Sequence, residues 1–80
     1  MKSIRVKYYA SLREQASTSA EVVETTAITA EELFIELKER HGFTVSNCQL
    51  RVSVNNSFSE MSYELKAGDE LVYIPPVAGG

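Results

Sequence analysis

Cysteine is nearly absent from this sequence, because Cys48 is the only one among 80 residues. A single thiol closes no disulfide within the chain, forms no CxxC redox pair and cannot make a cysteine zinc site. We therefore expect no metal site and a reducing, cytoplasmic environment. Cys48 stands in a segment without regular pattern, 43–49, where no neighbour that would activate its thiol is visible, so we assign it no chemistry.

Long apolar runs are absent as well, so no segment has the length of a membrane-spanning helix. The first residues, Met1 to Ser3, lead directly into a strand-like stretch and lack the apolar core of a signal peptide. Lys and Arg together number 8 and Asp and Glu 11, which gives a net charge of -3. Because an acidic chain is a poor ligand for nucleic acid or anionic membranes, we expect neither as a partner, and basic partners are favoured.

What is present suffices for one folded domain, since 44% of the residues are hydrophobic. Residues 2–10 alternate, with Ile4, Val6 and Tyr8 on one side, which predicts a strand with one buried face. Residues 11–16 suit a short helix. Further strands are expected where apolar or β-branched residues lie between turn signals, at 20–25, 50–54, 57–61 and 70–74.

The segment 29–41 carries the strongest helix signals. Thr29 suits the N-cap and Glu32 completes a capping box, while Gly42 suits the residue after the last turn. Its expected buried face consists of Ala30, Leu33, Phe34 and Leu37, and Ile35 falls opposite. His41, at the end of this helix, is expected to cap or pack rather than to serve as a ligand or base.

The order of elements is strand, strand, helix, strand, short strand, strand. A helix between strands allows a parallel pair, and one helix laid on one sheet is the simplest two-layer solution. The fold class is therefore α+β: a β-grasp (ubiquitin-like) domain over 1–76, with a mixed sheet of four to five strands packed on one main helix. Residues 77–80 are expected to form a flexible Gly-Gly tail.

The sequence ends in Pro75-Pro76-Val77-Ala78-Gly79-Gly80. Glycine is about 7% of residues, so a terminal pair arises by chance in roughly one chain in 200. Gly80 has no Cβ to obstruct attack at a main-chain carboxylate, and Gly79 adopts dihedrals closed to other residues. Two prolines stiffen the root of such a tail and lower the entropy lost on threading it into an enzyme. A frayed terminus without a role is the alternative.

This ending resembles the terminus of the molybdopterin synthase small subunit, of the MoaD/ThiS-type ubiquitin-like family. Three further segments resemble that family, and together they cover the whole chain in order: 8–14, 52–56 and 68–71. The segment 43–49 matches no motif of the family, and Cys48 has no place in its chemistry.

The resemblance implies a sulfur carrier that is not itself catalytic. An ubiquitin-activating-type (E1-like) adenylyltransferase, using ATP and magnesium, would adenylate Gly80, and the adenylate would become a thiocarboxylate. The carrier would then insert Gly79 and Gly80 into the large synthase subunit, within a heterotetramer. There it would donate sulfur to cyclic pyranopterin monophosphate during molybdenum cofactor biosynthesis. No cofactor is expected on this chain itself.

Docking of such a carrier calls for an apolar surface near the tail. If Leu71 faces the helix, alternation turns Val72 and Ile74 outwards, towards the side that Tyr9 occupies. The residues expected to contact partners are Tyr9, Phe58, Val72, Ile74, Pro75, Pro76, Val77 and Ala78. Ordinary core packing is the alternative for any one of the first four.

Three other functions stay open. Carriers for the thiazole of thiamine or for tRNA thiolation share the Gly-Gly ending, although Pro-Pro-Val-Ala before it favours the molybdopterin system. A protein modifier would be conjugated through Gly80 to lysines of its targets. An interaction module with an incidental tail would keep its role after deletion of Gly80.

Overall fold

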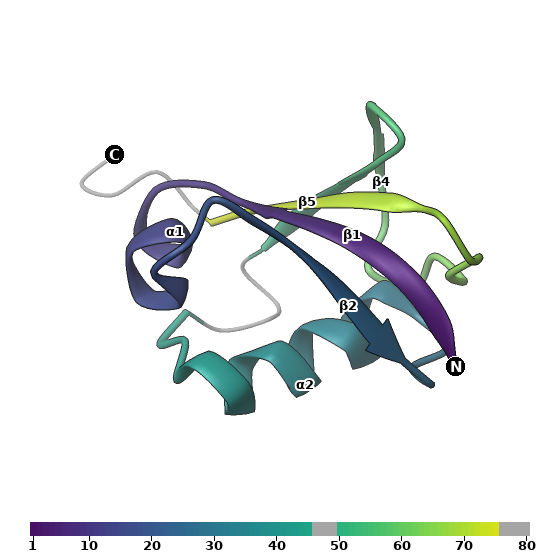
Figure 1. Cartoon of the computed structure of the whole chain (residues 1–80). Coiled ribbons are helices and arrows are strands. Elements are labelled where there is room, and N and C mark those ends of the chain that lie inside the picture. Colours follow the sequence, from purple (N-terminus) through teal and green to yellow (C-terminus); the bar gives the residue numbers. More distant parts are fainter. Residues whose placement is uncertain (46–49, 76–80) are drawn as a thin grey trace.

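The computed structural model describes residues 1–45 and 50–75. A single sheet lies over one long helix, with a short helix at the end of the sheet (Figure 1). In chain order the elements are β1 (Lys2–Tyr8), α1 (Ser11–Ala16), β2 (Ala20–Thr25), α2 (Ala30–His41), β3 (Arg51–Val54), β4 (Ser57–Ser59) and β5 (Glu70–Ile74).

The sheet has five strands in the order β2-β1-β5-β3-β4. Strand β5 is central and pairs with β1 in parallel, while the other three pairings are antiparallel. The sheet is therefore mixed, and the predicted α+β, β-grasp architecture is confirmed. The turn between β3 and β4 uses Asn55 and Asn56, both with positive φ, as a two-residue turn between antiparallel strands requires.

Two strands are shorter than their predictions. Strand β3 begins at Arg51 instead of Leu50, and β4 ends at Ser59 instead of Met61. The ladder ends at the pair Val52–Ser59, so the residues after Ser59 have no partner strand. The Met61 carbonyl instead accepts a hydrogen bond of 2.9 Å from the Glu31 N–H, at the start of α2.

Helix α2 has the predicted ends. The Thr29 side chain accepts from the Glu32 N–H at 3.2 Å, and Gly42 closes the helix with φ +73°. The capping box was predicted incorrectly in one detail, since the Glu32 carboxylate accepts from the N–H of Ile28 at 3.3 Å instead of that of Thr29. The Ala30 N–H, one of the groups at the start of a helix that have no partner within it, donates to the Tyr63 carbonyl at 3.0 Å.

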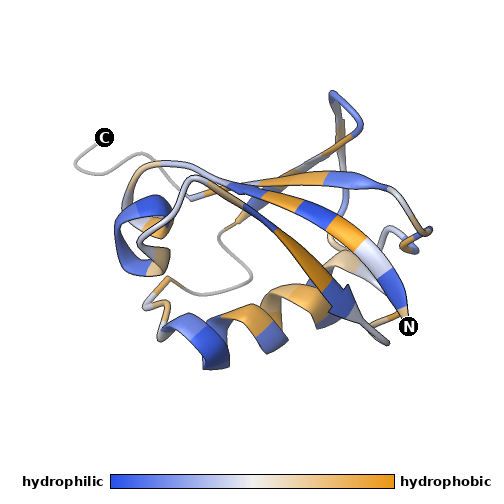
Figure 2. Cartoon of the chain, viewed as in Figure 1, coloured by the Kyte–Doolittle hydropathy of each residue, from blue (hydrophilic) through white to orange (hydrophobic). Residues whose placement is uncertain are grey.

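The core lies between the sheet and α2. Alternate residues of the strands turn inwards, and the apolar stretches of β1 and β5 face the apolar stripe of α2 (Figure 2). Phe43, predicted to be a loop residue, belongs to this core with 4% exposure, and its ring stacks on Phe34 at 5.6 Å. Within the described residues, no helix is long and apolar enough to cross a membrane.

Candidate functional site

Strand β5 positions the point from which the predicted tail leaves the domain. It is hydrogen-bonded on both sides, and its Tyr73 is fully buried. The Tyr73 hydroxyl donates to the Ala30 carbonyl at 2.7 Å, and burial raises the pKa of this phenol, so it stays a neutral donor. The end of β5 is thereby fixed to the first turn of α2, and the last residues of the strand have a set direction.

The predicted tail residues lie mostly beyond the described part of the chain. Of the residues expected to react or to contact partners, this holds for Pro76, Val77, Ala78, Gly79 and Gly80. Cys48 also lies outside the described residues. Pro75 is described and is buried, and its contact with a partner stays a prediction.

The other four predicted contact residues share the face of the sheet that points away from α2. Tyr9 is 54% exposed and Phe58 is 75% exposed, whereas Val72 and Ile74 are half-buried. Leu71 and Tyr73 turn inwards, as the alternation required. We call Tyr9, Phe58, Val72 and Ile74 the outer patch.

The strand register divides the outer patch into two rows. Ser53 pairs with both Val72 and Phe58, so these two side chains lie two strands apart, about 10 Å across the sheet. Tyr8 pairs with Tyr73. Ile74 is the next residue of β5, and Tyr9 directly follows the end of β1. The outer patch therefore runs from the end of β1 across β5 to β4, beside the root of the tail.

Cationic side chains border the outer patch. Arg5 and Lys7 each lie 3.7 Å from a carboxylate oxygen of Glu70, and Arg51 is exposed beside Ile74. Such exposed pairs add little stability.

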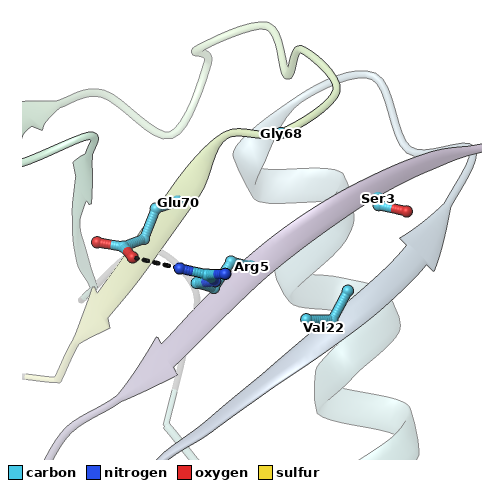
Figure 3. Close-up of a pocket in the computed structure, with 5 residues that line it drawn as sticks. All are labelled: Ser3, Arg5, Val22, Gly68 and Glu70. Atoms are coloured by element: carbon cyan, nitrogen blue, oxygen red, sulfur yellow. Dashed lines mark ion pairs between the residues drawn. The ribbon is translucent and has the colours of Figure 1, made fainter.

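Arg5 and Glu70 also line an open pocket of about 240 Å³ with Ser3, Val22 and Gly68, on the side of the sheet opposite α2 (Figure 3).

A second polar cluster lies at the C-terminal end of β1, on the side of the sheet that faces α2. The Tyr8 hydroxyl and the His41 Nε2 both contact the same oxygen of Glu21, the latter at 2.7 Å. Burial opposes ionisation of Glu21, yet the hydrogen bonds from Tyr8 and His41 hold the pKa of this carboxyl below its ordinary value. Burial, and then Glu21, raises the pKa of Tyr8. The His41 ring also packs at 5.3 Å from Phe43, so its role is packing and hydrogen bonding, as predicted.

Sequence reasoning missed the importance of Asp69, which it treated as a turn residue. Asp69 is buried and accepts hydrogen bonds from the Asn55 side chain (3.1 Å), the Tyr63 hydroxyl (2.9 Å) and the Lys66 N–H (2.8 Å). Although burial raises the pKa of this carboxyl, these bonds outweigh it and hold the pKa below its ordinary value. The carboxylate ties the β3–β4 turn to the segment before β5. A turn signal alone could not reveal these distant donors.

The pattern of strands, the buried anchor Tyr73 and the outward apolar side chains beside the tail can be compared with known proteins. Residues 6–80 match the ThiS family. This chain belongs to the ThiS family. Curated relatives extend the likeness over nearly the whole length. The molybdopterin synthase sulfur carrier subunit of Drosophila melanogaster is 37% identical, over 98% of this chain and 91% of that protein. The subunit of the same name from Escherichia coli (strain K12) is 30% identical, over 96% and 99%.

Solved structures of similar chains agree with the β-grasp fold of this ThiS-family protein. A putative molybdopterin converting factor, subunit 1, from Pyrococcus furiosus has a TM-score of 0.77 and 28% identity, over 96% of this chain and all of that one (100%). SAMP1 from Haloferax volcanii has a TM-score of 0.77 and 25% identity, over 98% and 99%. A complex of subunits 1 and 2 of the molybdopterin-converting factor from Helicobacter pylori 26695 contains a chain alike in fold, with a TM-score of 0.65 and 22% identity over 98% and 99%.

Proposed function

We propose that this chain is the sulfur carrier subunit of a cytoplasmic molybdopterin synthase. The observation that carries the proposal is the likeness, across nearly the full length, to sulfur carrier subunits of that synthase from an insect and a bacterium. The sequence supports it with the ending Pro-Pro-Val-Ala-Gly-Gly. In this role the chain binds no cofactor and catalyses nothing itself.

The reacting group is the carboxylate of Gly80. An E1-like partner transfers AMP to it from ATP in the presence of magnesium and releases pyrophosphate. A sulfur donor then displaces AMP and leaves a thiocarboxylate. The large synthase subunit receives the tail and moves the sulfur to cyclic pyranopterin monophosphate. Glycine at 79 and 80 suits this threading because neither residue carries a side chain.

The structure supplies features that suit such docking. The outer patch lies beside the end of β5, so one partner surface can cover Tyr9 and Ile74 while it receives the tail. Two hydrogen bonds, one between Tyr73 and Ala30 and one between Asn55 and Asp69, hold β5 in place. A heterotetramer with the large subunit is the assembly we expect, and the subunit complex from Helicobacter pylori is a precedent within the fold.

Intact-protein mass spectrometry tests the first step. The chain is incubated with ATP, magnesium, an activating enzyme known to be competent and a sulfur donor, alongside a variant that lacks Gly80. We expect a mass gain equal to the exchange of one oxygen for sulfur, confined to the full-length chain. Absence of that gain would contradict the carrier function. Reconstitution with the large subunit then distinguishes molybdopterin from thiamine or tRNA thiolation as the destination.

A protein-modifier function is the second candidate, favoured by the likeness to SAMP1, which a second structure names the small archaeal modifier protein 1. A protein modifier and a sulfur carrier leave different covalent products. Conjugation would leave Gly80 in isopeptide bonds to lysines of other proteins, detectable after tryptic digestion as the segment 67–80, which follows Lys66, attached to a target lysine. A sulfur carrier releases a free carboxylate after each transfer and leaves no such attached segment.

A further inference from the structure

Strand β2 forms an open edge of the sheet. The strand order leaves β2 at one side and β4 at the other. Strand β4 has three residues, whereas β2 has six, and the β2–β1 register runs without interruption from Lys2–Thr25 to Lys7–Ala20. The longer edge is thus a regular template for another extended segment.

The hydrogen-bond pattern identifies which groups of β2 are open. The Tyr8 N–H donates to the Ser19 carbonyl at 3.0 Å, and antiparallel ladders alternate, so Glu21, Val23 and Thr25 also bond to β1. The intervening Ala20, Val22 and Glu24 point their N–H and C=O groups outwards. The Thr18 hydroxyl bonds to both backbone groups of Ala20. None of the described residues bonds to those of Val22 and Glu24.

Three of the devices that usually protect an edge strand, Lys, Pro and a β-bulge, are missing from β2. Its sequence, AEVVET, has neither Lys nor Pro, and its ladder has no bulge. Val22 is 65% exposed on the outer face of the sheet, at the wall of the 240 Å³ pocket that Figure 3 shows. An apolar side chain on an added strand would pack against Val22 at that pocket.

The inner side of the same edge is acidic. Helix α2 is fastened to β2 by the Thr25 hydroxyl, which donates to Glu36 at 3.0 Å, and by the contact of Glu21 with His41. The carboxylates of Glu21 and Glu36 therefore line the inner side of this edge, and the nearby Arg40 offsets that of Glu21. Glu24 turns to the outer face, as Val22 does. A second copy of β2 would add two more glutamates and no cation, so self-pairing is disfavoured.

We propose that the β2 edge is a second docking surface, which takes an extended, basic segment of a partner protein as a sixth strand. Backbone bonds to Val22 and Glu24 supply affinity, and the alternation of the added strand supplies specificity. Its apolar residues lie on the outer face beside Val22, and its Lys or Arg residues face Glu21 and Glu36. Strand β1 separates this edge from β5, so the outer patch stays available at the same time.

Amide NMR of the full chain with a defined probe tests the proposal. The probe is a short, end-blocked peptide of alternating Val and Lys, and its control alternates Val and Glu. We expect the Val-Lys peptide to shift the amide signals of Val22 and Glu24 and to slow their hydrogen exchange. The Val-Glu peptide should leave both unchanged.

Two variants locate the binding. Glu36→Lys should weaken binding of the Val-Lys peptide roughly fivefold, the order expected for one lost charge pair. The matched control, Glu60→Lys, makes the same charge change at an exposed residue beyond β4 and should have no effect. Val22→Pro removes an N–H that faces away from β1, so it should abolish binding while the fold stays intact in a thermal melt.

Several results would overturn the proposal. These are unchanged Val22 and Glu24 amides at saturating peptide, equal binding of the Val-Glu peptide, or equal weakening by Glu36→Lys and Glu60→Lys. Slow exchange at Val22 without any peptide, together with a dimer in sedimentation, would assign the edge to a second copy instead. None of these measurements needs an activating enzyme, so they stand or fall apart from the sulfur-carrier function.

Discussion

Replacing Ala10 with glycine should stabilise this protein, against the usual effect of that substitution. Ala10 joins β1 to α1 with φ +51° and ψ -127°, a conformation that a residue with a Cβ rarely adopts. The Leu12 N–H donates to the Tyr9 carbonyl at 3.1 Å, so Ala10 holds the turn position where glycine dominates. Relief of such strain is worth about 1–3 kcal/mol. The extra freedom of glycine in the unfolded chain costs about 0.5–1 kcal/mol.

The net gain in the free energy of unfolding is therefore about 1 kcal/mol, which raises Tm by about 4–8 °C in a domain of this size. Urea and thermal unfolding of Ala10→Gly measure it. The matched control is Ala20→Gly, at an exposed strand residue without positive φ, which should lower stability by about 0.5–1 kcal/mol. If both variants lose stability equally, the strain argument at Ala10 is wrong.

The remaining predictions concern pH, the core and the outer patch. The pKa values of Glu21 and Asp69 are lower in the folded chain, so their stabilisation is complete above about pH 5 and disappears as the pH falls through the folded-state values. Urea unfolding at stepped pH measures this, and Asp69→Asn should flatten the profile. Leu37→Ala removes a fully buried side chain and should cost about 2–5 kcal/mol in a thermal or urea melt, with a smaller loss indicating that the site collapses. Phe58→Ala should change stability by less than about 0.5 kcal/mol, yet weaken binding to the activating enzyme or large subunit about tenfold by calorimetry; unchanged affinity would remove Phe58 from the outer patch.

Local signals in the sequence were enough to predict the elements of this fold. Alternation over residues 2–10 predicted β1, because one face of the strand packs on a helix, and an apolar run between turn signals predicted β5 at 70–74. Thr29 and Gly42 marked α2, since capping depends on residues close in the chain. Alternation also placed Tyr9, Val72 and Ile74 on the outer side of the sheet. Their role in binding stays a prediction.

Contacts between distant residues were beyond such signals. Glu21 contacts His41, which is 20 positions away in the sequence, and Asp69 contacts Asn55, which is 14 positions away. No pattern among neighbouring residues indicates either contact. The positive φ at Ala10 could not be predicted for a different reason: alanine is not a residue typical of such a turn. The ends of β3 and β4 were set by where a partner strand stops, which is also a property of the assembled sheet.

The central place of β5 has a mechanical consequence. A force that draws on the chain after β5, as when a tail is withdrawn from an enzyme, acts along the strand and loads its bonds to β1 and β3 together. Bonds sheared in parallel fail together, whereas an edge strand peeled sideways loses them one at a time. The hydroxyl of Tyr73, bonded to Ala30, adds a fastening perpendicular to the pull. A pull on the end of β5 therefore meets more resistance than a pull on an edge strand of the same sheet.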